Sequence, residues 1–379
     1  MEQVFLRFPH LSENIFKLLD MPSSFCFMQV WRSSIVHGIL YSPTVISAFT
    51  YDSASSLKNI LQELTNDSLI QLACDFIEVY REFPTGTKQT LELNCYTPLH
   101  EAAKKGLDLV YEFVVQDLVK HKGQSKYWST IWYTNPKDSE GITPLHLAAK
   151  NGHESLCELI MERIKKYPGN YEFNRTPLHF AAEMGHYNVC QFLIYQIKGD
   201  KNPKEADYLD TPLHVASENG HLKVCQLIIY HILKTGGNVN PMNEIHETPL
   251  YLAARNGHYE VCKFIIDKVS DKNPKNPTSG DTPLHWAALN GHLSVCKLFI
   301  DNVGDKNPQN NIFTTPLHLA AEYGHLEICE LFIQKIADKS PQNEKCETPF
   351  YLAKKNGHVL VSELLKIVWK IRKKSYEEL

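Results

Sequence analysis

A single tetrapeptide, Thr-Pro-Leu-His or a close variant, recurs along most of this chain and restricts the folds open to it. Its eight copies start 46, 33, 35, 37, 34, 33 and 33 residues apart. A unit of about 33 residues cannot bury its apolar face by itself, so we expect the units to stack into a curved solenoid. The copies start at Thr97, Thr143, Thr176, Thr211, Thr248, Thr282, Thr315 and Thr348.

Each copy carries the signals of two helices and a loop, as the unit that starts at Thr282 shows. Thr282 suits a helix N-cap, because its hydroxyl accepts a free backbone N–H of the first turn, and Pro283 suits the first helical position. Gly291 suits the end of that helix, because glycine readily adopts the left-handed conformation found there. A polar loop rich in Asn, Asp and Pro closes the unit. The second helix is predicted from apolar residues spaced to form one buried face: Val295, Leu298 and Phe299.

The period near 33 residues and the T-P-L-H-x-A core resemble the ankyrin repeat. The resemblance covers residues 91–379, about three quarters of the chain. It implies an all-α fold, an ankyrin-repeat solenoid of about eight helix-turn-helix units behind a helical N-terminal module. It also implies a protein-interaction scaffold that binds a partner protein through its loop tips and the concave face formed by the first helices.

Six of the ten cysteines lie at one repeat position, fourteen residues after the threonine and beside the apolar face of the second helix. Equivalent residues of neighbouring helices stand about 10 Å apart, whereas a disulfide needs Cα atoms within about 7 Å. We therefore expect buried, free thiols, which suit a reducing compartment. The six are Cys157, Cys190, Cys225, Cys262, Cys296 and Cys329.

Thirteen of the eighteen histidines lie at two repeat positions, the fourth residue of the tetrapeptide and the residue after the helix-ending glycine. The resemblance implies that they bridge backbone groups of neighbouring repeats. The sequence has no close C-x-x-C or H-x-x-x-H pair, no glycine-rich nucleotide-binding motif and no G-x-S-x-G elbow. We therefore expect no enzyme, no catalytic residue, no cofactor and no metal ion.

Charge and hydropathy restrict the partners and the location of the chain. A net charge of -4 with 22% charged residues gives no sign of nucleic acid or an anionic membrane as the main partner. No apolar run approaches the ~20 residues that span a bilayer. Charged residues also interrupt the start of the chain, unlike a signal peptide. We expect no membrane span and a cytoplasmic or nuclear location.

Positions on the predicted concave face vary from repeat to repeat while the scaffold positions do not. Acidic side chains gather there in the middle repeats, which favours a partner segment of positive charge. A solvated face that tunes solubility explains the same pattern. Aromatic residues are better candidates for binding hot spots than charges, although packing within the array also explains Trp286. The predicted partner-binding residues are Glu183, Met184, Tyr208, Asp210, Glu218, Arg255, Asp281, Trp286, Phe313 and Tyr323.

One loop departs from the period, because the first interval is about thirteen residues longer than the typical one. Its aromatic residues are too apolar for a purely solvated loop. They either pack back on the array or form a separate binding finger. They are Tyr127, Trp128, Trp132 and Tyr133.

Residues 1–50 lack the tetrapeptide and resemble an F-box, a helical module that docks its protein on the adaptor of cullin-type ubiquitin ligases. The resemblance rests on Phe8-Pro9-His10-Leu11, Ile15-Phe16, Leu18-Leu19-Asp20, Phe27, Val30 and Trp31. It implies a substrate receptor of such a ligase, with these adaptor-binding residues: Pro9, Leu11, Ile15, Phe16 and Leu19. The alternative is a helical cap on a simple adaptor or sequestering protein with no ubiquitin-ligase link. Residues 51–90 read as a helical connector or a degenerate repeat, and residues 91–379 as the array.

Overall fold

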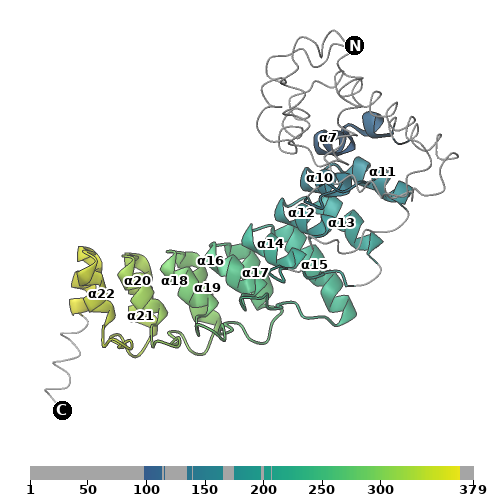
Figure 1. Ribbon diagram of the computed structural model, residues 1–379. Coiled ribbons are helices and arrows are strands. Elements are labelled where there is room, and N and C mark those ends of the chain that lie inside the picture. The colour runs from purple at the N-terminus through teal and green to yellow at the C-terminus, as the bar shows by residue number, and fades with distance from the viewer. Residues whose placement is uncertain are drawn as a thin grey trace, which may run out of the picture. The chain divides into compact units, whose positions relative to one another are not determined.

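The chain forms helices and turns, and no strand, throughout the residues that the structure describes (Figure 1). This confirms the all-α class.

The chain divides into two units, Met1–Ala181 with Asn188–Ile197 (unit 1) and Ala182–Tyr187 with Lys198–Leu379 (unit 2). The predicted N-terminal module, the connector and the four aromatic residues of the long loop lie outside the described residues. The computed structural model describes residues 98–112, 115, 135–138, 140–164, 175–197, 200–205 and 207–367.

Every described repeat has the predicted order of a short first helix, a turn and a second helix. The first helices begin at the proline of the tetrapeptide: α7 (Pro98–Lys105), α10 (Pro144–Lys150), α12 (Pro177–Glu183), α14 (Pro212–Glu218), α16 (Pro249–Arg255), α18 (Pro283–Leu289), α20 (Pro316–Glu322) and α22 (Pro349–Lys355). The second helices are α11 (Glu154–Ile164), α13 (Tyr187–Gln196), α15 (Leu222–Thr235), α17 (Tyr259–Ile266), α19 (Leu293–Asn302) and α21 (Leu326–Lys335). Residues 108–112 and 359–367 are also helical. No helix in these ranges is both long enough and apolar enough to cross a membrane.

Local signals set both ends of a first helix, as α14 shows. Thr211 has an extended backbone (φ -109°, ψ 164°), and its hydroxyl accepts the N–H of His214. The proline follows at the first helical position, where its missing N–H costs nothing. After the helix, Gly220 has φ of +75°, and His221 N–H donates to the Ala216 carbonyl at 2.9 Å. The threonine therefore starts the helix and the glycine ends it, as predicted.

The core of unit 2 lies between two rows of helices. First helices α14, α16, α18, α20 and α22 pack on one another in sequence order, and second helices α15, α17, α19 and α21 form the other row (Figure 1). Small side chains permit the close approach, since Ala253 and Ala254 of α16 are fully buried. Each second helix buries one apolar face, which in α17 comprises Val261, Cys262, Ile265 and Ile266.

The six repeat cysteines are buried free thiols, which confirms the prediction made from their common position. Burial raises the pKa of Cys157, Cys225 and Cys329 to about 12. These thiols therefore stay protonated and unreactive near neutral pH. Cys346 is also free, but it is exposed on a loop.

Candidate protein-binding surface

Where the tetrapeptide ends in histidine, that histidine joins the first helix to the repeat that follows it, as His214, His285 and His318 show. In α14, Thr211 N–H donates to His214 Nδ1 (3.1 Å), and His214 Nε2–H donates to the Glu247 carbonyl of the next repeat (3.2 Å). His285 and His318 donate in the same way to the residue before the next threonine. Burial lowers the pKa of His214 and His285 to about 4. The neutral ring with its proton on Nε2 therefore persists at neutral pH.

The histidines after the helix-ending glycines form a second contact between repeats. His258 Nε2–H donates to the Glu218 carbonyl of the preceding repeat at 2.8 Å, and His292 Nε2–H donates to the Arg255 carbonyl at 3.0 Å. Each ring lies against the glycine of the preceding repeat, which leaves no room for a side chain there. These contacts confirm the predicted bridging role. In the described ranges, no group of His, Cys, Asp and Glu side chains is arranged to hold a metal ion.

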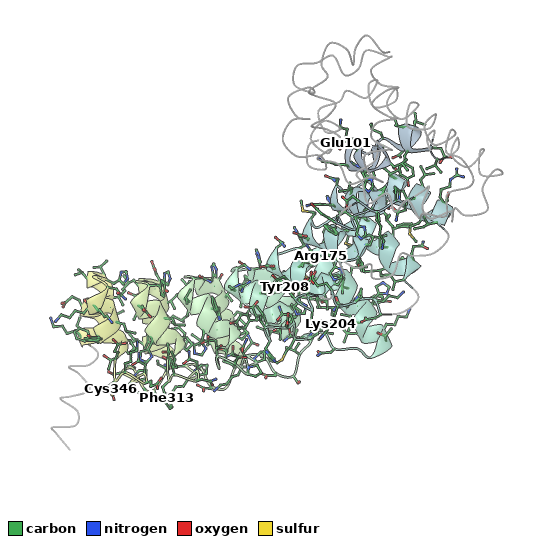
Figure 2. The ribbon with its side chains drawn as sticks, viewed as in Figure 1. Glu101, Arg175, Lys204, Tyr208, Phe313 and Cys346 are labelled. Atoms are coloured by element: carbon green, nitrogen blue, oxygen red, sulfur yellow. The ribbon has the colours of Figure 1, made fainter. Side chains whose placement is uncertain are left out.

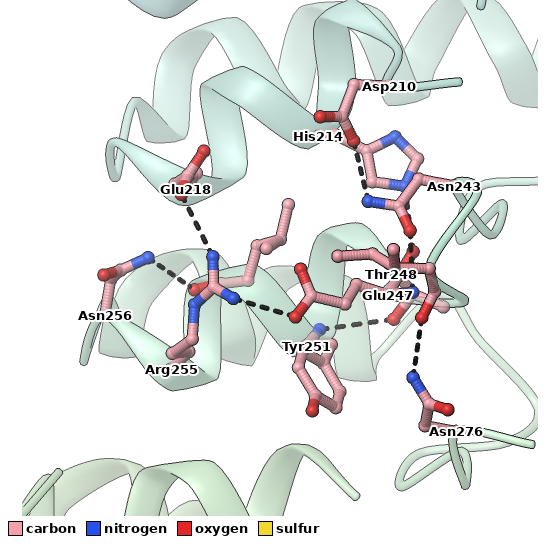
Figure 3. Close-up of polar contacts among 12 residues, drawn as sticks. Asp210, His214, Glu218, Asn243, Glu247, Thr248, Tyr251, Arg255, Asn256 and Asn276 are labelled. Atoms are coloured by element: carbon pink, nitrogen blue, oxygen red, sulfur yellow. Dashed lines mark hydrogen bonds and ion pairs between the residues drawn. The ribbon is translucent and has the colours of Figure 1, made fainter. Parts of the chain in front are cut away.

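A charged and aromatic cluster lies on the face formed by the first helices of unit 2, which we call the first-helix face (Figure 3). Arg255 Nη2 lies 3.1 Å from Glu218 Oε1, and Arg255 Nη1 lies 2.8 Å from Glu247 Oε1. The guanidinium carbon also stands 5.9 Å from the Trp286 ring centroid, which in turn is 5.9 Å from that of Tyr251. Burial raises the pKa of the Glu247 carboxyl, and Arg255 opposes this shift. One arginine thus links three successive repeats.

Besides Glu218, the predicted acidic residues Asp210 and Asp281 also have partners inside the array. The loop between the second helix of one repeat and the first helix of the next is called a finger below. Asp210 Oδ1 accepts a hydrogen bond from Asn243 Nδ2 of the next finger at 2.9 Å. Asp281 Oδ1 accepts one from Asn310 Nδ2 at 2.8 Å. Both carboxylates therefore position a neighbouring finger.

Further hydrogen bonds join the tips of successive fingers, and we call this series the finger ladder. Each bond runs from a backbone N–H or an asparagine amide of one finger to a backbone carbonyl of the finger before it. The series fixes each fingertip relative to the next. Its members are Glu244 N–H to the Tyr208 carbonyl (2.8 Å), Asn276 Nδ2 to the Ile245 carbonyl (2.8 Å), Asn311 N–H to the Ser279 carbonyl (3.0 Å) and Glu344 N–H to the Ile312 carbonyl (3.0 Å).

A family model described as "Ankyrin repeats (3 copies)" matches most of the chain. The matches cover residues 57–167, 99–205, 162–240, 199–276 and 270–343. The chain belongs to the ankyrin-repeat family. Ankyrin repeats bind protein partners, and the family and fold are typically non-enzymatic interaction modules.

A solved structure supports the fold of this ankyrin-repeat protein. The ankyrin repeat domain of Bcl-3, described as a unique member of the IkappaB protein family, is 22% identical, with a TM-score of 0.51. The alignment covers 60% of this chain and 99% of that domain. At this identity the likeness concerns the fold alone. No curated protein matches the chain.

The ten predicted partner-binding residues of this ankyrin-repeat protein lie on two surfaces and do not converge on one pocket. Tyr208 and Phe313 lie on fingers and are exposed (Figure 2). Met184 and Tyr323 are exposed just past the ends of first helices, and Trp286 is half-buried. The eight residues on or beside the first helices are Glu183, Met184, Asp210, Glu218, Arg255, Asp281, Trp286 and Tyr323. The five predicted adaptor-binding residues lie outside the described part of the chain.

A set of finger residues escapes prediction from the sequence. They have left-handed backbones although they carry side chains, and each stands two residues before a threonine. Gly141 and Gly280 occupy the same position in other repeats, with φ of +73° and +75°. The glycines at this position of two repeats are the signal in the sequence that the position needs a left-handed backbone. Ile245 and Ile312 directly precede two of these left-handed residues, His246 and Phe313. They are exposed and also escape prediction. The left-handed residues are Leu209 (+56°), His246 (+61°), Phe313 (+57°) and Cys346 (+57°).

Proposed function

We propose that this ankyrin-repeat protein is a scaffold whose first-helix face in unit 2 binds a positively charged segment of a partner protein. A surplus of carboxylates carries the proposal. The residue before the threonine and the seventh residue after it supply seven carboxylates in unit 2 but only two cations, Arg255 and Lys355. The carboxylates are Glu183, Asp210, Glu218, Glu247, Asp281, Glu322 and Glu347.

Both cations at these two repeat positions are already paired with carboxylates of the array. Arg255 contacts Glu218 and Glu247, and Lys355 Nζ lies 3.1 Å from Glu347 Oε1. The remaining negative charge is complementary to a basic partner segment, which it would attract over long range and hold in register. The alternative, a solvated face, predicts no dependence of binding on these carboxylates.

Apolar side chains beside the carboxylates offer contact area for the same partner. Tyr323 is exposed at a position where five of the other repeats have asparagine, and Leu289 stands where the other repeats have charged residues. Trp286 is half-buried and lies on the same helix as Leu289, α18. Aromatic residues at the centre of an interface contribute much of its binding energy, so we expect Tyr323 and Trp286 to contribute more than the charges.

Charge reversal on the first-helix face tests this function. Partners are captured with the full-length chain, identified by cross-linking and mass spectrometry, and then titrated in purified form. The variant Glu183→Lys, Glu218→Lys, Glu322→Lys should bind such a partner about tenfold or more weakly, because it reverses the charge the partner meets. Added salt should weaken wild-type binding for the same reason.

A matched control changes the same net charge on the second helices. The control variant is Glu260→Lys, Glu327→Lys, Glu330→Lys, whose side chains are exposed. It should retain wild-type affinity, since these positions lie off the first-helix face. Equal affinity in both triple variants would contradict the proposed site.

We further propose, as a second candidate, that the chain is the substrate receptor of a cullin-type ubiquitin ligase. The F-box-like pattern in residues 1–50 supports it, and the buried free thiols suit the cytosol or nucleus, where such ligases act. The full-length chain should then bind the purified ligase adaptor, and Ile15→Asp with Phe16→Asp should abolish that binding. Absence of binding by the wild-type chain would leave a simple adaptor or sequestering protein.

A further inference from the structure

Large apolar side chains recur at the tips of the fingers in unit 2. Tyr208, Ile245 and Ile312 share one repeat position, three residues before the threonine, and Phe313 follows Ile312. Their exposed fractions are 62%, 54%, 54% and 52% for Tyr208, Ile245, Ile312 and Phe313. We call these four residues the fingertip row. Apolar side chains exposed at one repeated position form an ordered surface, unlike single apolar residues scattered over a protein.

The fingertip row is held in place although part of its backbone is strained. The carbonyls of Tyr208, Ile245 and Ile312 each accept a hydrogen bond from the next finger. Phe313 has φ of +57°, a conformation that costs free energy for any residue with a side chain, whereas Gly280 adopts it freely at the equivalent position. The same backbone recurs at Leu209, His246 and Cys346, so the turn of the finger fixes where the exposed Phe313 ring stands.

We infer that the fingertip row binds an amphipathic α-helix of the partner protein, with an apolar side chain at every seventh residue and basic residues beside one end of that stripe. This deepens the scaffold function proposed above and rests on it. Helices of adjacent repeats pack about 8–10 Å apart, so successive fingertips recur at about that distance. Seven residues of α-helix rise about 10.5 Å and return to nearly the same face.

Other regular conformations of a partner segment suit the fingertip row less well. An extended strand covers ~10 Å in three residues, so its successive contacts would point to opposite faces. A polyproline II segment returns to the same face every third residue, but it is slender. An α-helix is about 10–12 Å wide with its side chains. That width is enough to contact a fingertip and the charged residue beside it.

Charges beside the fingertip row set the direction of the bound helix. Asp207 and Glu244 directly precede the first two members of the row and are exposed. Within the described residues no hydrogen bond or ion pair engages either carboxylate. At the other end of the row Glu344 is offset by its exposed neighbour Lys345. The basic residues of the helix therefore face the Tyr208 end. The finger between Ile245 and Ile312 carries Ser279 at this position, so the bound helix has a small residue in place of its third apolar side chain.

The test uses the full-length chain and one synthetic probe. The probe is a helical peptide of about 24 residues with leucine at every seventh position, serine at the third of these, and arginine beside the first two. Fluorescence anisotropy at low ionic strength gives its affinity. Tyr208→Ser and Phe313→Gly should each weaken binding about tenfold. Tyr230→Ser is the matched control, because Tyr230 of α15 is 61% exposed but lies off the row, and it should bind like wild type.

A charge exchange tests the direction of the helix. The variant Asp207→Lys, Glu244→Lys should bind the arginine peptide about tenfold more weakly, and it should regain affinity for a peptide with glutamate in place of arginine. Regain of affinity requires that these two fingers meet the charged end of the probe. Loss of affinity for both peptides would overturn the assigned direction.

Three results would overturn the inference as a whole. They are failure of the wild-type chain to bind the probe, equal affinities of Tyr208→Ser and Tyr230→Ser, and equal binding of a probe whose helix is broken by a central proline. None of these variants alters a first-helix carboxylate. If natural-partner binding still depends on Glu183, Glu218 and Glu322, the scaffold function stands and only the fingertip site is lost.

Discussion

Gly257 and Gly236 share a left-handed backbone but differ in their surroundings. Their φ angles are +78° and +72°. A Cβ atom at Gly257 would stand 2.5 Å from His292 Nδ1, whereas nothing lies within 4 Å of a Cβ atom at Gly236. The same substitution therefore measures backbone strain alone at Gly236, and strain together with a displaced histidine at Gly257.

Gly257→Ala should lower the free energy of unfolding by about 2–4 kcal/mol, because His292 must move and lose its bond to the Arg255 carbonyl. Gly236→Ala should cost about 1–2 kcal/mol, from the strained backbone only. Urea unfolding followed by circular dichroism measures both. Equal losses would show that the histidine contact contributes nothing to stability.

Phe313 allows the strain of a left-handed residue to be measured apart from its ring. Phe313→Ala removes the ring and keeps the strain, whereas Phe313→Gly removes both. The glycine variant should therefore be more stable than the alanine variant by about 1 kcal/mol in urea unfolding. Equal stability of the two would mean that the finger relaxes to another conformation when the ring is absent.

The role of a residue can be predicted where neighbouring residues in the sequence determine it, and it cannot be predicted where distant residues do. A threonine, a proline and a glycine within a few residues mark each first helix. In the structure the threonine and proline start the helix and the glycine ends it, as predicted. Phe313 shows the opposite case, since nothing in its neighbouring residues signals a left-handed backbone. Asp281 is predicted from the sequence as a partner-binding residue, and nothing near it in the sequence signals its hydrogen bond to Asn310, 29 residues away.

At the scale of the helix, the tetrapeptide histidines make the joints between first helices sensitive to acid. His146, His214 and His285 have pKa values lowered to about 4 by burial, against about 6.5 in an unfolded chain. The unfolded chain therefore takes up protons first as pH falls, so stability is full above about pH 6.5 and is lost toward pH 4. Between about pH 7.5 and pH 5 the loss should be roughly 1–2 kcal/mol per histidine, measured by urea unfolding.

A single substitution checks that these histidines cause the acid sensitivity. His285→Tyr copies the fifth repeat, which has Tyr251 at the equivalent position. This variant lacks one titrating group, so its stability should fall less steeply with pH than that of the wild type, whatever its stability at neutral pH. An unchanged slope would assign the acid sensitivity to other groups.

The helices and their order were predictable from the sequence because the threonine, the proline and the helix-ending glycine recur in all eight repeats. The apolar stripe of each second helix and its buried cysteine follow from spacing alone. The finger ladder was not predictable, because backbone carbonyls such as that of Tyr208 find their donors only after the repeats have stacked. Exposed apolar fingertips such as Ile245 escape prediction for the same reason, since spacing marks them as loop residues and no more.

On the scale of the whole molecule, long-range contacts connect the repeats, and on the first-helix face Arg255 contacts Glu218, Glu247 and the Trp286 ring. Arg255→Ala should lower the free energy of unfolding by about 1–3 kcal/mol, because the Glu247 side chain, only 9% exposed, would lose its cation. Lys335→Ala is the matched control, since its pair with Asp301 is long (3.8 Å) and exposed, and it should cost less than about 0.5 kcal/mol. Equal costs in thermal unfolding would contradict this ranking.

The finger ladder affects which partners the molecule can select. Fingertips joined to one another by hydrogen bonds cannot shift separately to suit a ligand, so the spacing between successive contact points is fixed. A partner is then selected by the intervals between its side chains as much as by their identity. One residue inserted into a bound helix would rotate every later side chain by about 100° about the helix axis. Those side chains would then no longer face the fingertips beyond the insertion.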